Sequence, residues 1–117
     1  MAKTAKSRTG KPKTAWEKVA LARDAKRPHV RDFIAELCDD FEELHGDRLC
    51  ADDAAMVAGF GRIGAHRVLV LGHNKGANVE ENVKSNFGMV NPEGYRKAMR
   101  LAKLAEKFHL PIVTFVD

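Results

Sequence analysis

Two short runs of apolar residues, at positions 68–71 and 112–116, constrain the fold of this chain most strongly. Neither run alternates with polar residues, which is typical of strands buried on both faces in an α/β sheet. The stretch between them carries helix signals, so strand, helices and strand form a crossover. We therefore expect the two strands to lie parallel with a right-handed connection. Asp117 then follows the carboxyl end of a buried parallel strand, where open α/β sheets place their ligand sites.

Capping and turn residues predict the remaining elements. Thr14 and Glu17 form a capping box that predicts a helix to about residue 24. Apolar spacings of three and four predict a second helix over about 30–44, stopped by Gly46. Alternation over 54–63 and the run at 67–71 predict an antiparallel hairpin, with Gly64 and Ala65 as a type II′ turn. Two further helix starts are Asn78 with Glu81, before a helix to about 86, and Asn91 with Pro92, before a helix to about 108.

The formal charge of +4 belongs to the N-terminus. Residues 1–13 hold five Lys and Arg and no acid, which leaves 15 positive and 16 negative charges for residues 14–117. This lysine-rich segment without aromatic residues predicts a disordered basic tail. A transit peptide and a nucleic-acid-binding arm are less favoured interpretations. The near-neutral body gives no support for nucleic-acid binding by the domain.

Other features disfavour whole classes of protein. No apolar run approaches the roughly 20 residues that span a bilayer, so membrane insertion is excluded. Cys38 and Cys50 are too few for a disulfide framework, and a reducing, cytoplasmic location is the default expectation. Cys38, His45 and Cys50 have metal-ligating side chains but form no CxxC pair, so no metal site is indicated.

The turn at residues 72–76 is the one candidate site that spacing alone suggests. Gly72 and Gly76 permit close backbone approach, and Lys75 adds a positive charge ahead of a helix start, a combination suited to a carboxylate or phosphate. An ordinary strand-to-helix turn remains the alternative. On the helix that follows, the basic residues are expected to form a solvated face: Arg96, Arg100, Lys103 and Lys107. Its expected apolar side is Tyr95, Ala98, Met99, Ala102, Ala105 and Phe108.

Several long runs resemble the α subunit of bacterial acetyl-CoA carboxylase carboxyltransferase. They are ELHGDR at 43–48, GHNKG at 72–76, NFGMVNPEGYRKAMR at 86–100, KLAEKF at 103–108 and PIVTFVD at 111–117. The resemblance covers about residues 14–117 and leaves the basic tail, 1–13, outside. It implies an α/β fold of the crotonase or ClpP-like type, a superhelix of ββα repeats, of which residues 14–117 form the N-terminal part with preceding helices.

The resemblance also implies a reaction and partners. A carboxyl group passes from carboxybiotin, on a separate carrier protein, to acetyl-CoA and gives malonyl-CoA, the first step of fatty-acid synthesis. The enzyme implied is biotin-dependent, ATP-binding and cytoplasmic. Its partners are a β subunit, in an α2β2 assembly, and the biotin carboxyl carrier protein. No membrane is involved, no metal is expected in this chain, and the zinc ribbon belongs to the β subunit.

Site residues carry over from the resemblance position by position. Lys75 is expected to recognise a carboxylate or line the site together with Gly76, and the pocket wall is expected to contain Asn86, Gly88 and Tyr95. Backbone N–H pairs stabilise enolate and ureido oxyanions in such chemistry. The glycines that supply them are expected after Asp117, so we expect no catalytic residue among these 117, and no activity from this polypeptide alone.

A strand covered on both faces needs layers that residues 1–117 do not complete, so we expect the front part of a larger α/β unit, or a chain that needs a partner.

Two rival interpretations of the function stay open. A truncated, non-catalytic paralogue that binds the β subunit or nucleic acid would fit the same sequence. A related acyl-CoA carboxyltransferase that uses propionyl-CoA would also fit.

Overall fold

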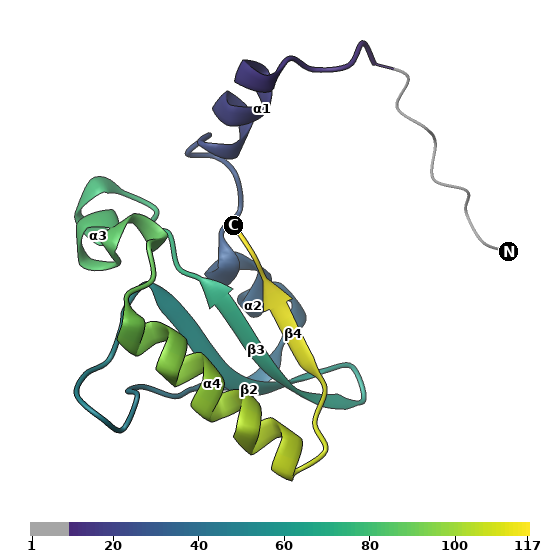
Figure 1. Cartoon of the computed structure of the whole chain (residues 1–117). Coiled ribbons are helices and arrows are strands. Elements are labelled where there is room, and N and C mark those ends of the chain that lie inside the picture. The colour runs from purple at the N-terminus through teal and green to yellow at the C-terminus, as the bar shows by residue number, and fades with distance from the viewer. Residues whose placement is uncertain (1–9) are drawn as a thin grey trace, which may run out of the picture.

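A computed structural model describes residues 10–117, which form a four-stranded sheet with a helix on each face (Figure 1). The strands are β1 (Asp39–Glu43), β2 (Met56–Ile63), β3 (His66–His73) and β4 (Ile112–Phe115), and they neighbour one another in this order. β2 is antiparallel to both β1 and β3, whereas β3 and β4 run parallel. The predicted hairpin and the predicted parallel crossover are therefore confirmed.

The hairpin turn lies where the sequence predicts it. Gly64 and Ala65 connect β2 to β3, and Ile63 pairs with His66 across the turn. Gly64 has φ +58, a conformation that glycine adopts without a steric penalty. A positive φ at the first central position only is the pattern of the type II′ turn.

Side chains of β2 and β3 alternate between two cores. The core on the side of α2 (Val30–Leu37) consists of Val30, Ile34, Val57, Val68 and Val70. The core on the side of α4 (Pro92–Lys107) consists of Ala58, Leu69, Leu101 and Ala105. Figure 1 shows α4 in front of the sheet and α2 behind it. Both faces of β3 are covered, as its unbroken apolar run predicts.

The N-terminal helix, α1 (Ala15–Ala22), begins at the predicted capping box. The Glu17 N–H donates to Thr14 Oγ1 at 3.2 Å, and the Thr14 N–H donates to the Glu17 carboxylate at 2.7 Å. The helix ends slightly before the predicted residue 24, and none of its residues is buried. Of the expected disordered tail, residues 1–9 lie outside the described residues, and residues 10–13 are exposed and belong to no helix or strand.

The prediction of a second helix over 30–44 is wrong beyond Leu37. Helix α2 ends there, and residues 39–43 form the edge strand β1, so Gly46 follows a strand rather than a helix. The partner strand explains the difference. A Cβ at Gly61 would lie 3.3 Å from Phe41 Cδ2, and one at Gly59 would meet the Phe41 ring. These two glycines leave room for Phe41 on β2, which helix periodicity in 30–44 cannot reveal.

The crossover from β3 to β4 contains α3 (Val79–Lys84), a short 3₁₀ turn η1 (Asn86–Gly88) and α4. The Asn78 side chain caps α3 by accepting from the Glu81 N–H, as predicted, whereas Asn91 makes no side-chain cap to α4. The predicted apolar side of α4 is only partly right. Its buried residues are Gly94, Lys97, Leu101 and Ala105, while Tyr95, Met99 and Phe108 are exposed.

No helix in the described part of the chain, residues 10–117, has both the length and the apolar character required to cross a membrane.

Candidate functional site

The carboxyl ends of β3 and β4 bring two predicted positions together. Lys75, in the turn after β3, places its Nζ 3.0 Å from Asp117 Oδ1, just beyond β4. The Asp117 N–H donates to His73 Nδ1 at 3.1 Å and ties the two strand ends to each other. A cation therefore lies at the sheet edge where ligand sites of α/β proteins form.

The electrostatics of this edge stabilise the ionised form of the Asp117 carboxylate. The hydrogen bond from Lys75 lowers the pKa of Asp117, and the positive charges of Lys75 and Arg27 lower it further against the opposing effect of burial. Arg27 Nη1 lies 3.8 Å from the same carboxylate. Two basic side chains, Lys75 from the turn after β3 and Arg27 from the segment before α2, thus act on one carboxylate, which stays ionised at neutral pH.

The backbone of the turn is already engaged. The Gly76 N–H donates to Asn82 Oδ1 at 3.0 Å, and the Asn82 side-chain amide donates to the Gly76 carbonyl at 3.2 Å. The Ala77 N–H donates to Glu81 Oε2 at 2.9 Å. A Cβ at Gly76 would clash with the α3 backbone. Gly76 therefore serves close packing of α3, and these two N–H groups are not free for an anion.

Of the expected wall residues, Gly88 touches Lys75. A Cβ at Gly88 would lie 2.9 Å from Lys75 Cγ, so the bare backbone of η1 packs on the lysine stem. Asn86, Phe87 and Gly88 all have positive φ, and the Asn86 amide closes this left-handed run by donating to the Met89 carbonyl at 3.0 Å. Tyr95 is 60% exposed on α4, and its hydroxyl makes no hydrogen bond within residues 10–117.

A hollow of about 310 Å³ opens beside this turn. Lys75 and Gly76 line it from one side and His29 from the other. His29 Nδ1 is buried and has no hydrogen-bond partner among the described residues. Buried polar atoms are normally paired, so this nitrogen is an exception within the described residues.

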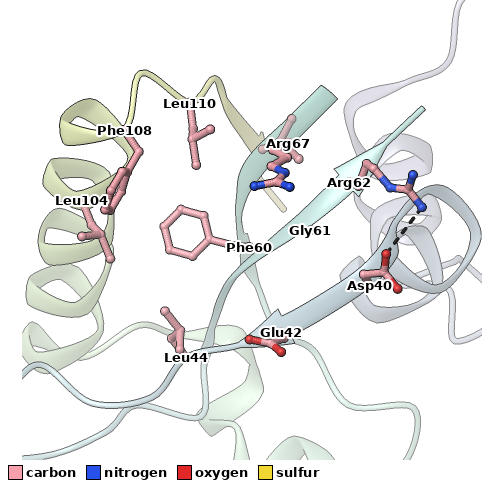
Figure 2. A pocket seen from close by; sticks show the side chains of 11 residues that line it. Asp40, Glu42, Leu44, Phe60, Gly61, Arg62, Arg67, Leu104, Phe108 and Leu110 are labelled. Carbon is pink, nitrogen blue, oxygen red and sulfur yellow. Dashed lines mark hydrogen bonds and ion pairs between the residues drawn. The ribbon is translucent and has the colours of Figure 1, made fainter. Parts of the chain in front are cut away.

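A larger hollow of about 880 Å³ lies at the opposite end of the strands (Figure 2). Its wall contains Phe60, Leu104 and Phe108. Arg62 Nη2 lies 3.4 Å from Asp40 Oδ2, and both residues also line the hollow. Its lining includes Arg67 and Val68, near the start of β3, whereas Lys75 lies beyond the end of β3. This hollow is therefore separate from the Lys75 site.

The sequence also fails to predict an ionic cluster on α4. Arg96 Nε donates to Asp47 Oδ2 at 2.8 Å, and the Arg100 guanidinium donates to the Gly46 carbonyl at 2.8 Å. The expectation of a solvated basic face is wrong for these two residues, whereas Lys103 and Lys107 are exposed. Lys97 is 1% exposed. Its position at helical spacing from Leu101 and Ala105 is the signal that could have placed it inward.

No group of three or more His, Cys, Asp or Glu side chains within residues 10–117 is arranged to hold a metal ion. Cys38 is partly buried, and this burial raises the pKa of its thiol. Cys50 is exposed in the loop between β1 and β2.

Comparisons with known proteins agree with one another. The family model described as acetyl co-enzyme A carboxylase carboxyltransferase-like matches residues 2–117. Two relatives are named acetyl-coenzyme A carboxylase carboxyl transferase subunit alpha. The protein from Blochmanniella floridana is 54% identical over 89% of this chain and 33% of the relative. The protein from Caulobacter vibrioides is 54% identical over 88% of this chain and 32% of the relative. The chain thus spans about a third of the length of the curated relatives it matches.

A solved structure supports the fold. The beta subunit of Pseudomonas aeruginosa geranyl-CoA carboxylase matches 78% of this chain and 19% of its own, with 28% identity and a TM-score of 0.56. The expected α/β fold of the crotonase type is confirmed by this likeness together with the four-stranded sheet.

Proposed function

The chain belongs to the acetyl-CoA carboxylase carboxyltransferase family, and on that premise we propose that it acts in transfer of a carboxyl group from carboxybiotin to acetyl-CoA, giving malonyl-CoA. Its relatives are named as the alpha subunit of this transferase. The match of the family model to residues 2–117 is the observation that carries the proposal. Carboxybiotin supplies the activated carboxyl group.

Within this reaction we assign the Lys75 ammonium to the recognition of a carboxylate. The contact that supports this assignment is the 3.0 Å ion pair in which the carboxylate of Asp117 lies against Lys75. A fixed cation at a partly buried position stabilises negative charge more than one in bulk water. Gly76 lets α3 pack closely behind the lysine, Gly88 supports its stem, and the Asn86 side chain closes the turn that carries Gly88. That Asn86 and Tyr95 shape the wall of the site stays a prediction.

The partners follow from the same premise. We propose that the chain works with a carboxyltransferase β subunit in an α2β2 assembly and receives carboxybiotin from the biotin carboxyl carrier protein, in the cytoplasm. ATP binding by the wider enzyme is an expectation from the family resemblance. That the 117-residue polypeptide has no turnover by itself also stays a prediction.

The test is an activity assay with the β subunit present. A version of the chain extended past Asp117 is co-expressed with the β subunit, and malonyl-CoA formation from acetyl-CoA is measured with carboxybiotin as donor. We expect turnover with both subunits and none with the 117-residue chain alone. Absence of turnover in the extended assembly would contradict the proposal, and faster turnover of propionyl-CoA would correct the substrate.

Lys75→Met tests the assigned role of the lysine. Loss of one charge at a substrate carboxylate is expected to lower kcat/KM about 100-fold, because a charge-assisted contact contributes about 3 kcal/mol. The matched control is Lys103→Met, since Lys103 is an exposed lysine on α4. Equal kcat/KM for Lys75→Met and the control would remove Lys75 from the site.

A further inference from the structure

The short turn η1 has a strained backbone. Asn86, Phe87 and Gly88 have φ of +47, +55 and +76, so three successive residues adopt the left-handed conformation. This conformation is uncommon outside glycine, and it persists only where the surrounding structure holds it in place. Burial of the Phe87 ring is not the compensation, because this side chain is 54% exposed. A reason for the strained backbone therefore lies in what the backbone itself contacts.

Hydrogen bonds fix η1 to the end of α3. The Gly88 N–H donates to the Ser85 carbonyl at 2.9 Å, and the Met89 N–H donates to the Asn86 carbonyl at 2.9 Å. The Asn86 side-chain amide adds its bond to the Met89 carbonyl at 3.0 Å. Ser85 is 3% exposed, and its hydroxyl donates to the Glu81 carbonyl in α3 at 3.0 Å. The turn is therefore closed on itself and anchored at one place.

The anchored turn lies against the base of the Lys75 side chain. A Cβ at Gly88 would lie 2.9 Å from Lys75 Cγ and 3.6 Å from the Asn74 carbonyl oxygen. Cγ is close to the lysine backbone, so it cannot move away without redirecting the ammonium. A free lysine samples many rotamers, and a contact at the start of its stem removes some of them. The Gly88 backbone therefore restricts the directions in which the Lys75 ammonium can point.

The restriction matters because Lys75 has more than one carboxylate nearby. The hollow beside it is also lined by Asp32 and Glu81. Each of these carboxylates accepts one backbone N–H, at 2.7 and 2.9 Å, which leaves acceptor capacity in both. The ammonium nevertheless lies 3.0 Å from Asp117, at the end of β4. A stem held in one direction accounts for this choice.

We propose that the left-handed turn Asn86–Gly88 is a positioning element for Lys75, in which Gly88 holds the lysine stem and Asn86 keeps the turn closed, so that the ammonium points to the carboxyl end of β4. This inference rests on the proposed function, in which Lys75 recognises a carboxylate at that edge. The turn acts through Lys75 and therefore positions rather than catalyses. A lysine whose direction is already fixed loses less entropy when it binds a carboxylate.

The titration of Asp117 reports the position of Lys75 without any substrate. The hydrogen bond from Lys75 is the largest cause that lowers the pKa of Asp117, so displacement of the ammonium raises this pKa towards its ordinary value. Gly88→Ala adds a Cβ against Lys75 Cγ and is expected to produce that rise. NMR titration of the side-chain carboxyl carbon of Asp117 measures the rise in the whole chain.

Gly64→Ala is the matched control. Gly64 also has a positive φ, of +58, but a Cβ there would meet nothing within 4 Å. The variant therefore adds a similar backbone strain in the hairpin turn before β3, whereas Lys75 lies beyond the other end of that strand. We expect it to leave the pKa of Asp117 at the wild-type value.

Asn86→Gly isolates the bond that closes the turn. Glycine tolerates the positive φ, so this variant removes the amide that reaches the Met89 carbonyl without adding strain. We expect a smaller rise in the pKa of Asp117 than in Gly88→Ala. An unchanged pKa in Asn86→Gly would remove Asn86 from the positioning element.

Activity gives a second readout. In the extended chain assembled with the β subunit, Gly88→Ala is expected to lower kcat/KM at least about tenfold, because a misplacement of about 1 Å can cost about 100-fold. Gly64→Ala should match the wild type. A rise in the pKa of Asp117 together with this loss of kcat/KM supports both the positioning role of the turn and the recognition role of Lys75.

The remaining outcomes separate the two roles. If Gly88→Ala leaves the pKa of Asp117 unchanged, or if Gly64→Ala raises it equally, the positioning role is overturned and the proposed function stands. If Gly88→Ala raises the pKa while Gly88→Ala and Lys75→Met both keep the kcat/KM of the wild type, the turn does position Lys75. In that case the recognition role assigned to Lys75 is the one that fails.

Discussion

Lys97 is a charged residue in a position that a leucine would normally take. It is buried under the loop between β1 and β2, and its ammonium is paired with Asp52. Burial by itself raises the pKa of Asp52, but the hydrogen bonds from Lys97 and from the Gly46 N–H outweigh it and lower the value to about 2. Removal of either partner leaves a charge without its counterion, which is far more harmful than replacing the whole pair.

The Asp52 carboxylate makes the stability of this loop dependent on acid. An unfolded Asp has a pKa of about 4, so the unfolded chain takes up the proton first as the pH falls. The stabilisation from ionised Asp52 is complete above about pH 4 and is lost as the pH falls through its folded pKa of about 2. We expect Asp52→Asn to be less stable than the wild type at pH 6, with a gap that narrows towards pH 2. Urea titrations across this range measure the gap, and a constant gap would contradict the role given to Asp52.

At the scale of elements, the sequence predicts those whose signals are local. The parallel crossover follows from the unbroken apolar run of each strand and the helix signals between them, and the hairpin follows from Gly64, because each of these signals is contained in one short segment. The α2–β1 boundary depends on Gly59 and Gly61, which lie far along the chain from Phe41. A hydrophobicity pattern assigns Lys97 to solvent, so it does not predict the inward face of α4.

The candidate site likewise combines a residue that the sequence predicts with contacts that it does not predict. Lys75 was predicted because its turn carries two glycines and a lysine in a short segment. Its contacts were not predictable, because His73 and Asp117 are 44 residues apart and Arg27 comes from the segment before α2. The contacts that hold the loop at residues 46–52 are likewise not predictable, since the arginines that make them have the pattern of a solvated helix face.

The packing of β1 on β2 provides a graded test of the α2–β1 boundary. Gly59→Ala would place a Cβ against the Glu42 carbonyl and the Phe41 ring, and we expect it to lower the free energy of unfolding by about 2 kcal/mol through overpacking. Gly61→Ala meets only a 3.3 Å contact with Phe41 and should cost less than about 1 kcal/mol. Chemical denaturation compares them, and a larger loss for Gly61→Ala would contradict the packing described.

At the scale of the whole molecule, α1 stands apart from the sheet and its helices (Figure 1). None of its residues is buried, whereas α2 contributes Val30 and Ile34 to a core. The cooperative body of the molecule therefore begins near α2.

Deletion of residues 1–24 tests where the body begins. We expect Tm to change by less than about 3 °C, as for changes at exposed surfaces. Val30→Asp, which buries an unpaired charge in the α2 core, should lower Tm by more than about 10 °C. Differential scanning calorimetry measures both, and a large drop on deletion would mean that α1 packs on the body.

The two edge strands of the sheet, β1 and β4, differ in how readily they pair with a further strand. In β1 the sequence is DDFEE, and its pairing with β2 is interrupted by an irregularity between Asp39 and Glu42. Two such edges would bring rows of carboxylates together, so β1 resists aggregation through strand pairing. In β4 the sequence is IVTF, without a charge. Growth of this sheet by strand addition can therefore proceed in one direction only, outward from β4.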